Sequence, residues 1–314
     1  MDGFLRGFIS RKWKIKGFSF TFLDILLAVC ITTAGLLLRS TVITAYTPFD
    51  APKAVGIVME YLLAVLCAAV VYRMAGSGIR AFLTYSILVV YPTVVANGSL
   101  WNVNCVMYVF LFFMGIFLFV SGYRLLGVLS GFAGLIVACG RFVSWYVSEG
   151  AAAQSLTRGW PDVYEIIGST TFVEYFDKVS WLFLAGLLAT AAYCMFKKGV
   201  RVDAELAFMS FLFLSVLIPY FAPFMPAWAG YTADIALLIY CMMRPRRFYL
   251  PMLHIICSYA AYAYVINGET KLPMVVYAVI LMGILANLGV DLYRTAVGKC
   301  RTAGEMSVNE ARTV

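Results

Sequence analysis

Ten apolar runs follow one another along the chain, separated by short polar stretches. Most of them are about 17 to 23 residues long, which is the length that an α-helix needs to cross the hydrocarbon layer of a membrane. They lie near residues 20–39, 54–74, 81–98, 105–122, 125–146, 179–196, 206–222, 229–243, 248–265 and 272–293. The pattern predicts an all-α protein, a polytopic transmembrane helical bundle of about ten spans.

Basic residues lie mostly on one side of these predicted spans. Ten spans place both termini on the same side, and this side carries 18 of the 24 lysines and arginines, including those of the N-terminal RKWKIK and of the PRR stretch ending at Arg247. Because basic loops stay in the cytoplasm, both termini are predicted to be cytoplasmic in a multi-pass protein of the plasma (inner) membrane.

This topology divides the chain into three parts. Residues 1–19 form a basic and aromatic segment that we expect to lie along the inner headgroups, with a solvated tail as the alternative. Residues 20–294 form the membrane domain, with outer loops at 40–53 and 147–178, and residues 295–314 form a cytoplasmic tail. The second loop contains IIGSTTFVEYF, which predicts a short interfacial helix, and its Trp160 and Tyr175 suit an aromatic belt at the headgroups.

Composition strengthens the membrane assignment. The chain is 63% hydrophobic and 13% charged, with a mean hydropathy of +0.88, unlike a soluble domain. Its eight cysteines form no CxxC pair, so neither a disulfide framework nor a zinc site is indicated. The net charge of +8 follows from basic loops that face anionic lipid, and it gives no reason to expect a nucleic-acid partner.

Charged side chains inside the predicted spans are candidates for function, because each costs about 2.5 to 3.5 kcal/mol at a helix centre unless it is paired or faces water. The candidates are Asp24, Glu60, Arg141, Asp234 and Asp291. Asp24 and Asp291 lie near cytoplasmic ends, where they can reach water or basic neighbours. Arg141 lies toward the outer half of its span, where it is expected either to hold a lipid phosphate or to pair with Glu60 or Asp50.

Three stretches in order carry a resemblance to a known family. The first runs from YPTVVANGSLWNVNCVMYVF to GRF at Arg141, and in it Pro92 is expected to bend the helix before the polar island around Trp101. The second is WPDVYEIIG, and the third is FAPFMPAWAGYTADIALLIY. Together with a first span ending in Arg39, they resemble the bacterial polytopic GT-C type glycosyltransferases over roughly residues 20–290.

The resemblance implies an enzyme that takes a sugar from a polyprenyl-phosphate donor at the outer leaflet. It implies Asp50 as the catalytic base and Arg141 and Arg158 as lipid-phosphate contacts. The substrate-pocket residues that it implies are Trp101, Asn104, Asp162, Tyr164 and Glu165. It identifies no metal ligand and no certain cofactor, and a divalent cation at the phosphate stays an option.

Several positions depart from the family pattern. Cys105 stands where the family has the acid of its WGQxD island, and Met225 to Trp228 stand where it has MHER. Asp234 matches a late acid of the family and is expected to serve as a structural partner for a neighbouring helix. These losses predict weak or degenerate catalysis, since sugar transfer needs a carboxylate base and cationic help for the departing phosphate.

Two other functions fit the same residues. The chain can be a non-catalytic GT-C-like partner of other envelope-assembly proteins in polysaccharide synthesis, or a transporter with Glu60, Asp24 and Asp291 along an ion pathway. The missing inverted repeat counts against a transporter. His254, the only histidine, is expected to be a packing residue rather than a ligand.

Overall fold

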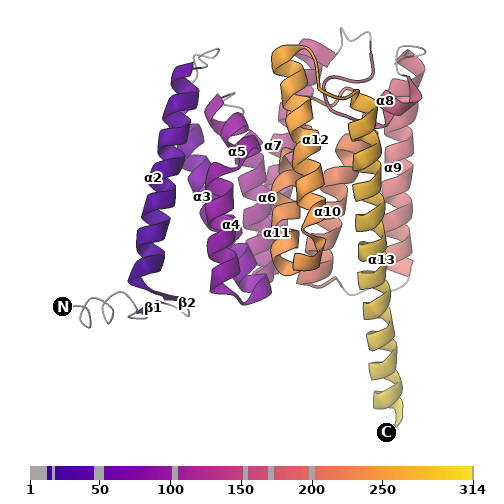
Figure 1. Cartoon of the computed structure of the whole chain (residues 1–314). Helices are drawn as coiled ribbons and strands as arrows, with labels where there is room; N and C mark the ends of the chain where they lie inside the picture. The colour runs from indigo at the N-terminus through magenta and orange to yellow at the C-terminus, as the bar shows by residue number, and fades with distance from the viewer. Residues whose placement is uncertain are drawn as a thin grey trace, which may run out of the picture. The chain divides into compact units, whose positions relative to one another are not determined.

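A computed structural model of the chain shows a predominantly helical protein (Figure 1). It describes residues 13–15, 18–45, 53–100, 105–150, 155–168, 173–197 and 202–312. The described residues form two compact units. Unit 1 comprises Met1–Arg141 and Leu238–Arg247, and unit 2 comprises Phe142–Leu237 and Phe248–Val314.

The chain begins its described part with a small β-ribbon. Strands β1 (Trp13–Ile15) and β2 (Phe18–Phe20) pair antiparallel, with Trp13 opposite Phe20. This ribbon is the exception to the predicted all-α class. The rest of the predicted N-terminal segment lies outside the described residues.

The helices that begin in unit 1 cover the first half of the chain. They are α2 (Phe22–Ala45), α3 (Lys53–Ala75), α4 (Gly78–Val90), α5 (Pro92–Val95), the π-helix η1 (Ala96–Leu100), α6 (Cys105–Val120) and α7 (Arg124–Trp145), and the unit also contains the 3₁₀ turn η4 (Pro245–Arg247). Helix α3 packs against both α4 and α6, and α2 packs against α4. Unit 1 is therefore built around α3, whose Leu63, Cys67 and Val70 are buried.

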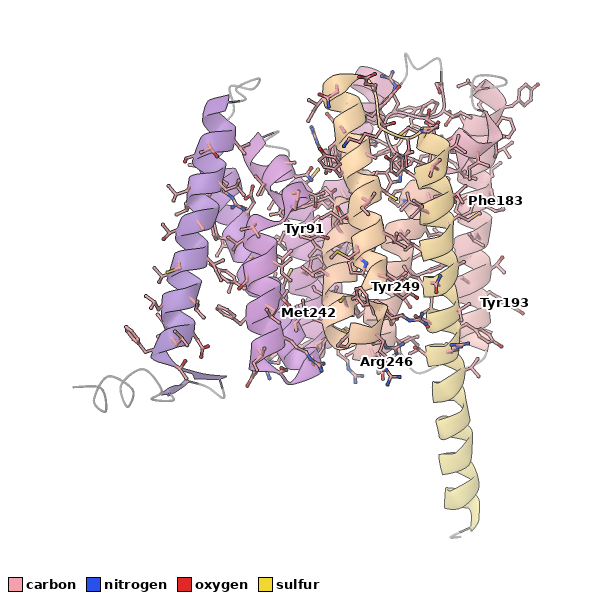
Figure 2. All side chains as sticks on the ribbon, viewed as in Figure 1. Tyr91, Phe183, Tyr193, Met242, Arg246 and Tyr249 are labelled. Carbon is pink, nitrogen blue, oxygen red and sulfur yellow. The ribbon has the colours of Figure 1, made fainter. Side chains whose placement is uncertain are left out.

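The second half of the chain supplies the helices of unit 2. They are η2 (Tyr146–Gly150), α8 (Val163–Ile167), α9 (Val173–Lys197), α10 (Ala204–Phe221), η3 (Ala227–Gly230), α12 (Tyr249–Asn267) and α13 (Met274–Arg312), together with the first part of α11 (Tyr231–Met243), whose residues from Leu238 on belong to unit 1. Helix α13 packs against α10 and α12 and then runs on past their ends (Figure 1). Tyr249 of α12, labelled in Figure 2, donates to Oδ1 of Asn287 on α13 at 3.2 Å.

Every predicted span coincides with a helix. Within the described residues, six helices are long and apolar enough to cross a membrane, and the bent pair Gly78–Val90 and Pro92–Gly98 makes up to seven. The helices Cys105–Val120 and Ala227–Met243 are apolar but shorter. The membrane character of the chain follows from these helices, and the count of ten crossings stays a prediction.

Pro92 bends its helix, as predicted. Tyr91, labelled in Figure 2, has an extended backbone before the proline, and the two helix axes differ by 48° at this break. Because Pro92 has no N–H group and its ring excludes the preceding residue from helical geometry, the ladder of helix hydrogen bonds stops here.

Two loop boundaries differ from the predicted ones. Helix α2 continues to Ala45, so Arg39 lies inside the helix rather than at its end. Helix α9 begins at Val173, and the short helix before it covers Val163–Ile167, so the helix predicted over IIGSTTFVEYF is wrong in its position. Helix α2 is longer than predicted because the small and apolar residues 40–45 continue it beyond the hydrocarbon thickness used to define a span.

Candidate functional site

The structure brings part of the predicted site together in unit 2. Arg158, Asp162, Tyr164 and Glu165 lie on one segment, residues 155–168, here named the docking segment. Arg141 belongs to unit 1. The other predicted site residues, Asp50, Trp101 and Asn104, lie outside the described residues.

The docking segment packs into unit 2 through its backbone and its apolar side chains. The N–H of Phe224 donates to the carbonyl of Leu156 at 2.7 Å, and Arg158 and Gly159 form β-bridges with Pro226. Leu156 and Tyr164 are buried in an apolar cluster with Trp145 and Phe224. The segment is thus part of the folded core of its unit.

Trp160 is buried, which corrects its assignment to an aromatic belt. Only 1% of its surface is exposed, and its ring fills the space over Gly230, where any Cβ atom would collide with it. The ring also lies beside the imidazole of His254, with 5.9 Å between the ring centroids. A sequence pattern cannot distinguish a buried tryptophan from an interfacial one, because both types of site favour the same residue.

Asp162 is the most unusual acid of the docking segment. Its residue surface is fully buried, and its Oδ1 accepts the N–H of Tyr164 at 3.0 Å, which caps the short helix α8. Its Oδ2 has no hydrogen-bond partner among the described residues. Burial raises the pKa of this carboxyl well above its ordinary value of 3.8, and the nearby Glu165 raises the pKa further.

The groups around Asp162 are also polar and partly buried. Tyr164 donates from its hydroxyl to the carbonyl of Phe221 at 2.6 Å, and burial raises its pKa to about 12. Tyr220 lies close enough to Asp162 to interact with it electrostatically, and its hydroxyl has no partner among the described residues. Desolvation also raises the pKa of Glu165. The segment therefore keeps a proton-holding acid beside a phenol, which is suited to acid–base chemistry.

Asp234 has the structural role that its sequence position predicted. Its Oδ1 contacts Nδ1 of His254 at 2.6 Å and accepts the hydroxyl of Ser258 at 3.0 Å. Both partners lie on α12, so the acid links α11 to the next helix. The expectation for His254 as a packing residue is incomplete, because one ring nitrogen is bonded to an acid and the other has no partner among the described residues.

Glu60 is paired with Arg39 in unit 1. The guanidinium of Arg39 donates to Oε2 of Glu60, and it also donates to the backbone carbonyls of Gly35 at 3.0 Å and Val89 at 2.7 Å. The Val89 carbonyl is available because the helix breaks at Tyr91. Sequence analysis missed this pair, since it placed Arg39 at a span end and considered only Arg141 as the partner of Glu60.

Arg141 lies near the end of α7 and is half-buried. It interacts electrostatically with the buried thiol of Cys105, the first residue of α6. Cys105 therefore lies within electrostatic range of Arg141, the predicted phosphate contact. No group of three or more metal-ligating side chains occurs in the part of the chain that the structure describes.

No family model, no curated protein and no solved structure matches this chain, so its possible activity has to be argued from these residues.

Proposed function

We propose that the chain is an integral membrane glycosyltransferase-like protein that binds a polyprenyl-phosphate-linked sugar at the outer leaflet of the plasma (inner) membrane. Turnover is weak in this proposal, both termini are cytoplasmic, and ten helices cross the membrane. The proposal develops the resemblance to GT-C type enzymes with the chemistry of the described residues.

The observation that carries the proposal is the buried carboxyl of Asp162, with one oxygen free of partners on a predicted outer-face segment. Desolvation raises the pKa of this carboxyl, so it holds a proton more readily than an exposed aspartate does, and sugar transfer to a hydroxyl requires a group that exchanges a proton. Structural acids are normally satisfied at both oxygens, and this one is not. Among the described residues, we therefore assign the role of acid–base group to Asp162. Asp50, which lies outside the described residues, keeps its predicted role as base.

Arg158 supplies the second requirement, a cation for the departing phosphate. It lies four residues before Asp162 on the docking segment, and its backbone is fixed by the bridge to Pro226. A guanidinium is suited to phosphate because it can donate two parallel N–H bonds. We assign to Arg141 in unit 1 a lipid-phosphate contact of the same kind.

Sugar transfer in liposomes tests the proposal. Purified protein is mixed with polyprenyl-phosphate-linked hexose and a lipid acceptor, and labelled product is counted over time. Asp162→Asn keeps the cap of α8 but cannot exchange a proton, so we expect a loss of at least about 100-fold.

The matched control is Asp203→Asn. Asp203 caps α10 through the same type of bond, to the N–H of Leu206 at 2.9 Å, but it is exposed. This control should retain wild-type transfer. Wild-type transfer that persists in Asp162→Asn would remove Asp162 from the reaction.

A second candidate function is a non-catalytic partner in envelope polysaccharide assembly. One observation favours it. Pro226 stands where the pattern of GT-C type enzymes has ionisable groups, and it forms β-bridges with Arg158 and Gly159. The docking segment therefore lies against the residues that would otherwise carry those ionisable groups. Saturable binding of the lipid-linked sugar without any transfer would support this second candidate over the first.

Two of the three acids of the transporter alternative have partners in the structure. Glu60 is held by Arg39, and Asp24 closes the first turn of α2 by accepting the N–H and hydroxyl of Thr21 at 2.7 and 2.9 Å. Both acids thus have structural roles that an ion pathway would disrupt.

A further inference from the structure

Two buried polar atoms lie without partners where the docking segment meets the end of α10. They are Oδ2 of Asp162 and the hydroxyl of Tyr220, and neither makes a hydrogen bond within the described part of the chain. Only 1% of the surface of Tyr220 is exposed, and none of that of Asp162. Buried polar atoms are nearly always hydrogen-bonded in folded proteins, so these two indicate a place where a further group binds.

Tyr164 holds the two residues close together. Its N–H donates to Oδ1 of Asp162 at 3.0 Å, and its hydroxyl donates to the carbonyl of Phe221 at 2.6 Å. Phe221 directly follows Tyr220, and the two rings lie edge to face with 5.1 Å between their centroids. Asp162 and Tyr220 also interact electrostatically, and all of these residues belong to unit 2. The two atoms without partners therefore belong to one local site.

The polar groups next to this site are already hydrogen-bonded. Oδ1 of Asp162 and the hydroxyl of Tyr164 have the partners just named, and the side chain of Glu165 is hydrogen-bonded to Thr157. Among the described groups of the site, the acid oxygen of Asp162 and the phenol of Tyr220 are thus the ones that a ligand can satisfy.

The chemistry of these two atoms selects the ligand. A phosphate suits the phenol but not an ionised carboxyl, because it brings negative charge and few hydrogens to donate. A metal ion needs several oxygen ligands, and no group of three metal-ligating side chains occurs among the described residues. A hydroxyl donates one hydrogen and accepts another, so it satisfies both atoms whether the carboxyl is ionised or protonated. We infer that Tyr220 and Asp162 bind a neutral hydroxyl group, which bridges the phenol and Oδ2.

This inference rests on the proposed function, because Asp162 is its acid–base group, and it deepens that function in two ways. It assigns Tyr220, which lies outside the set implied by the sequence, as the residue that positions the acceptor hydroxyl. It also makes the acceptor a neutral alcohol, such as the hydroxyl of a sugar or of a polyol lipid headgroup. Binding makes and breaks no covalent bond, so it can be measured apart from sugar transfer.

Fluorine NMR tests the site directly. The full chain is labelled with 3-fluorotyrosine and placed in phosphatidylcholine nanodiscs, and the ¹⁹F signal of Tyr220 is identified by its loss in Tyr220→Phe. Methyl α-D-glucopyranoside should shift this signal in a saturable way, whereas the fully O-methylated glucoside, which has no hydroxyl, should not. In a second arm, phosphatidylglycerol is compared with phosphatidylethanol, which lacks the hydroxyls. A shift in that arm identifies a lipid headgroup as the source of the hydroxyl.

Variants show whether the phenol makes the contact. Ligand-detected NMR measures the affinity for the glucoside. Tyr220→Phe keeps the ring beside Phe221 but lacks the hydroxyl, so binding should weaken about tenfold. Tyr249→Phe is the matched control, because it removes a phenol of the same unit that is bonded to Asn287, and it should bind like the wild type. Unchanged ¹⁹F signals of the other tyrosines in Tyr220→Phe show that the fold is kept.

Asp162→Asn separates this inference from the proposed function. Its amide can still bond a hydroxyl, so the glucoside should bind within about threefold of the wild type while sugar transfer is lost. Alcohol binding by a wild-type protein that transfers no sugar would remove the proposed function and leave the inference standing. A Tyr220 signal that responds to neither the glucoside nor phosphatidylglycerol, or binding that is equally strong in Tyr220→Phe, would overturn the inference even if the wild type transfers sugar.

Discussion

Arg39 shows how one side chain can satisfy several buried groups at once. It neutralises Glu60, its guanidinium carbon lies 4.9 Å from the centroid of the Tyr61 ring, and it donates to the Val89 carbonyl that the break before Pro92 leaves without a helix partner. Gly98 contributes by having no side chain, because a Cβ atom there would collide with the Glu60 carboxylate. The pair therefore stabilises the contacts among α2, α3 and α4.

Removing one partner of this pair should be costly. Arg39→Met removes the cation that faces the buried Glu60, so we expect a loss of about 3–5 kcal/mol in the free energy of unfolding, measured by denaturant titration in mixed micelles. The double variant Arg39→Met, Glu60→Leu should recover most of this loss. If the single variant is as stable as the wild type, the pair is not structural.

Asp162 should make the stability of the protein depend on pH. Its pKa is raised in the folded state, so the folded protein keeps this proton at pH values where the unfolded chain has lost it. The contribution of the neutral acid is therefore complete below the unfolded pKa near 4 and is lost as the pH rises toward the folded pKa. Thermal unfolding of wild type and Asp162→Asn between pH 4 and pH 8 measures it. As the pH rises, the unfolding midpoint of the wild type should fall relative to that of Asp162→Asn. A difference between the two midpoints that stays constant with pH would contradict the raised pKa of Asp162.

At the scale of elements, glycines set the contact between α6 and α7 within unit 1. A Cβ atom on Gly127 would lie 2.7 Å from the carbonyl oxygen of Gly115, so the two backbones touch directly. Close approach of this kind is how small residues hold membrane helices together. The contact requires glycine for space rather than for backbone conformation.

The alanine variants of two glycines on α7 test this contact. Gly127→Ala should separate the helices and lower the thermal unfolding midpoint. Gly140→Ala is the control, because a Cβ atom there meets nothing within 4 Å. It should leave the midpoint unchanged or raise it, since alanine favours a helix by about 1 kcal/mol over glycine. Equal effects of the two variants would show that helix propensity, not packing, determines the change in the unfolding midpoint.

Helix positions were predictable from the sequence, whereas the partners of polar groups were not. Each apolar run gave a helix because the spacing and length of apolar residues determine that structure locally. The pairing of Arg39 with Glu60, and of Asp234 with His254, depends on which helices pack together, and hydropathy contains no such information. The burial of Trp160 in unit 2 was missed for the same reason.

For the whole molecule, the basic residues predict that both termini are cytoplasmic and that the docking segment lies outside. Ser155→Cys should react with an impermeant maleimide on intact cells, above the background of the native cysteines. Ser307→Cys, in the predicted cytoplasmic tail, should react only after permeabilisation. Protection of Ser155→Cys together with labelling of Ser307→Cys on intact cells would invert the topology.

The proposed binding of a lipid-linked phosphosugar is tested most directly by a binding measurement. Purified protein in nanodiscs is titrated with radiolabelled polyprenyl-phosphate hexose, with unlabelled polyprenyl phosphate as competitor. We predict saturable binding that Arg141→Ala reduces at least about tenfold, because a charge-assisted contact to phosphate contributes about 1.5–3 kcal/mol. Arg124→Ala, which removes an exposed arginine at the opposite end of the same helix, should bind like the wild type. Binding that does not saturate, or that is equally strong in Arg141→Ala, would contradict the account.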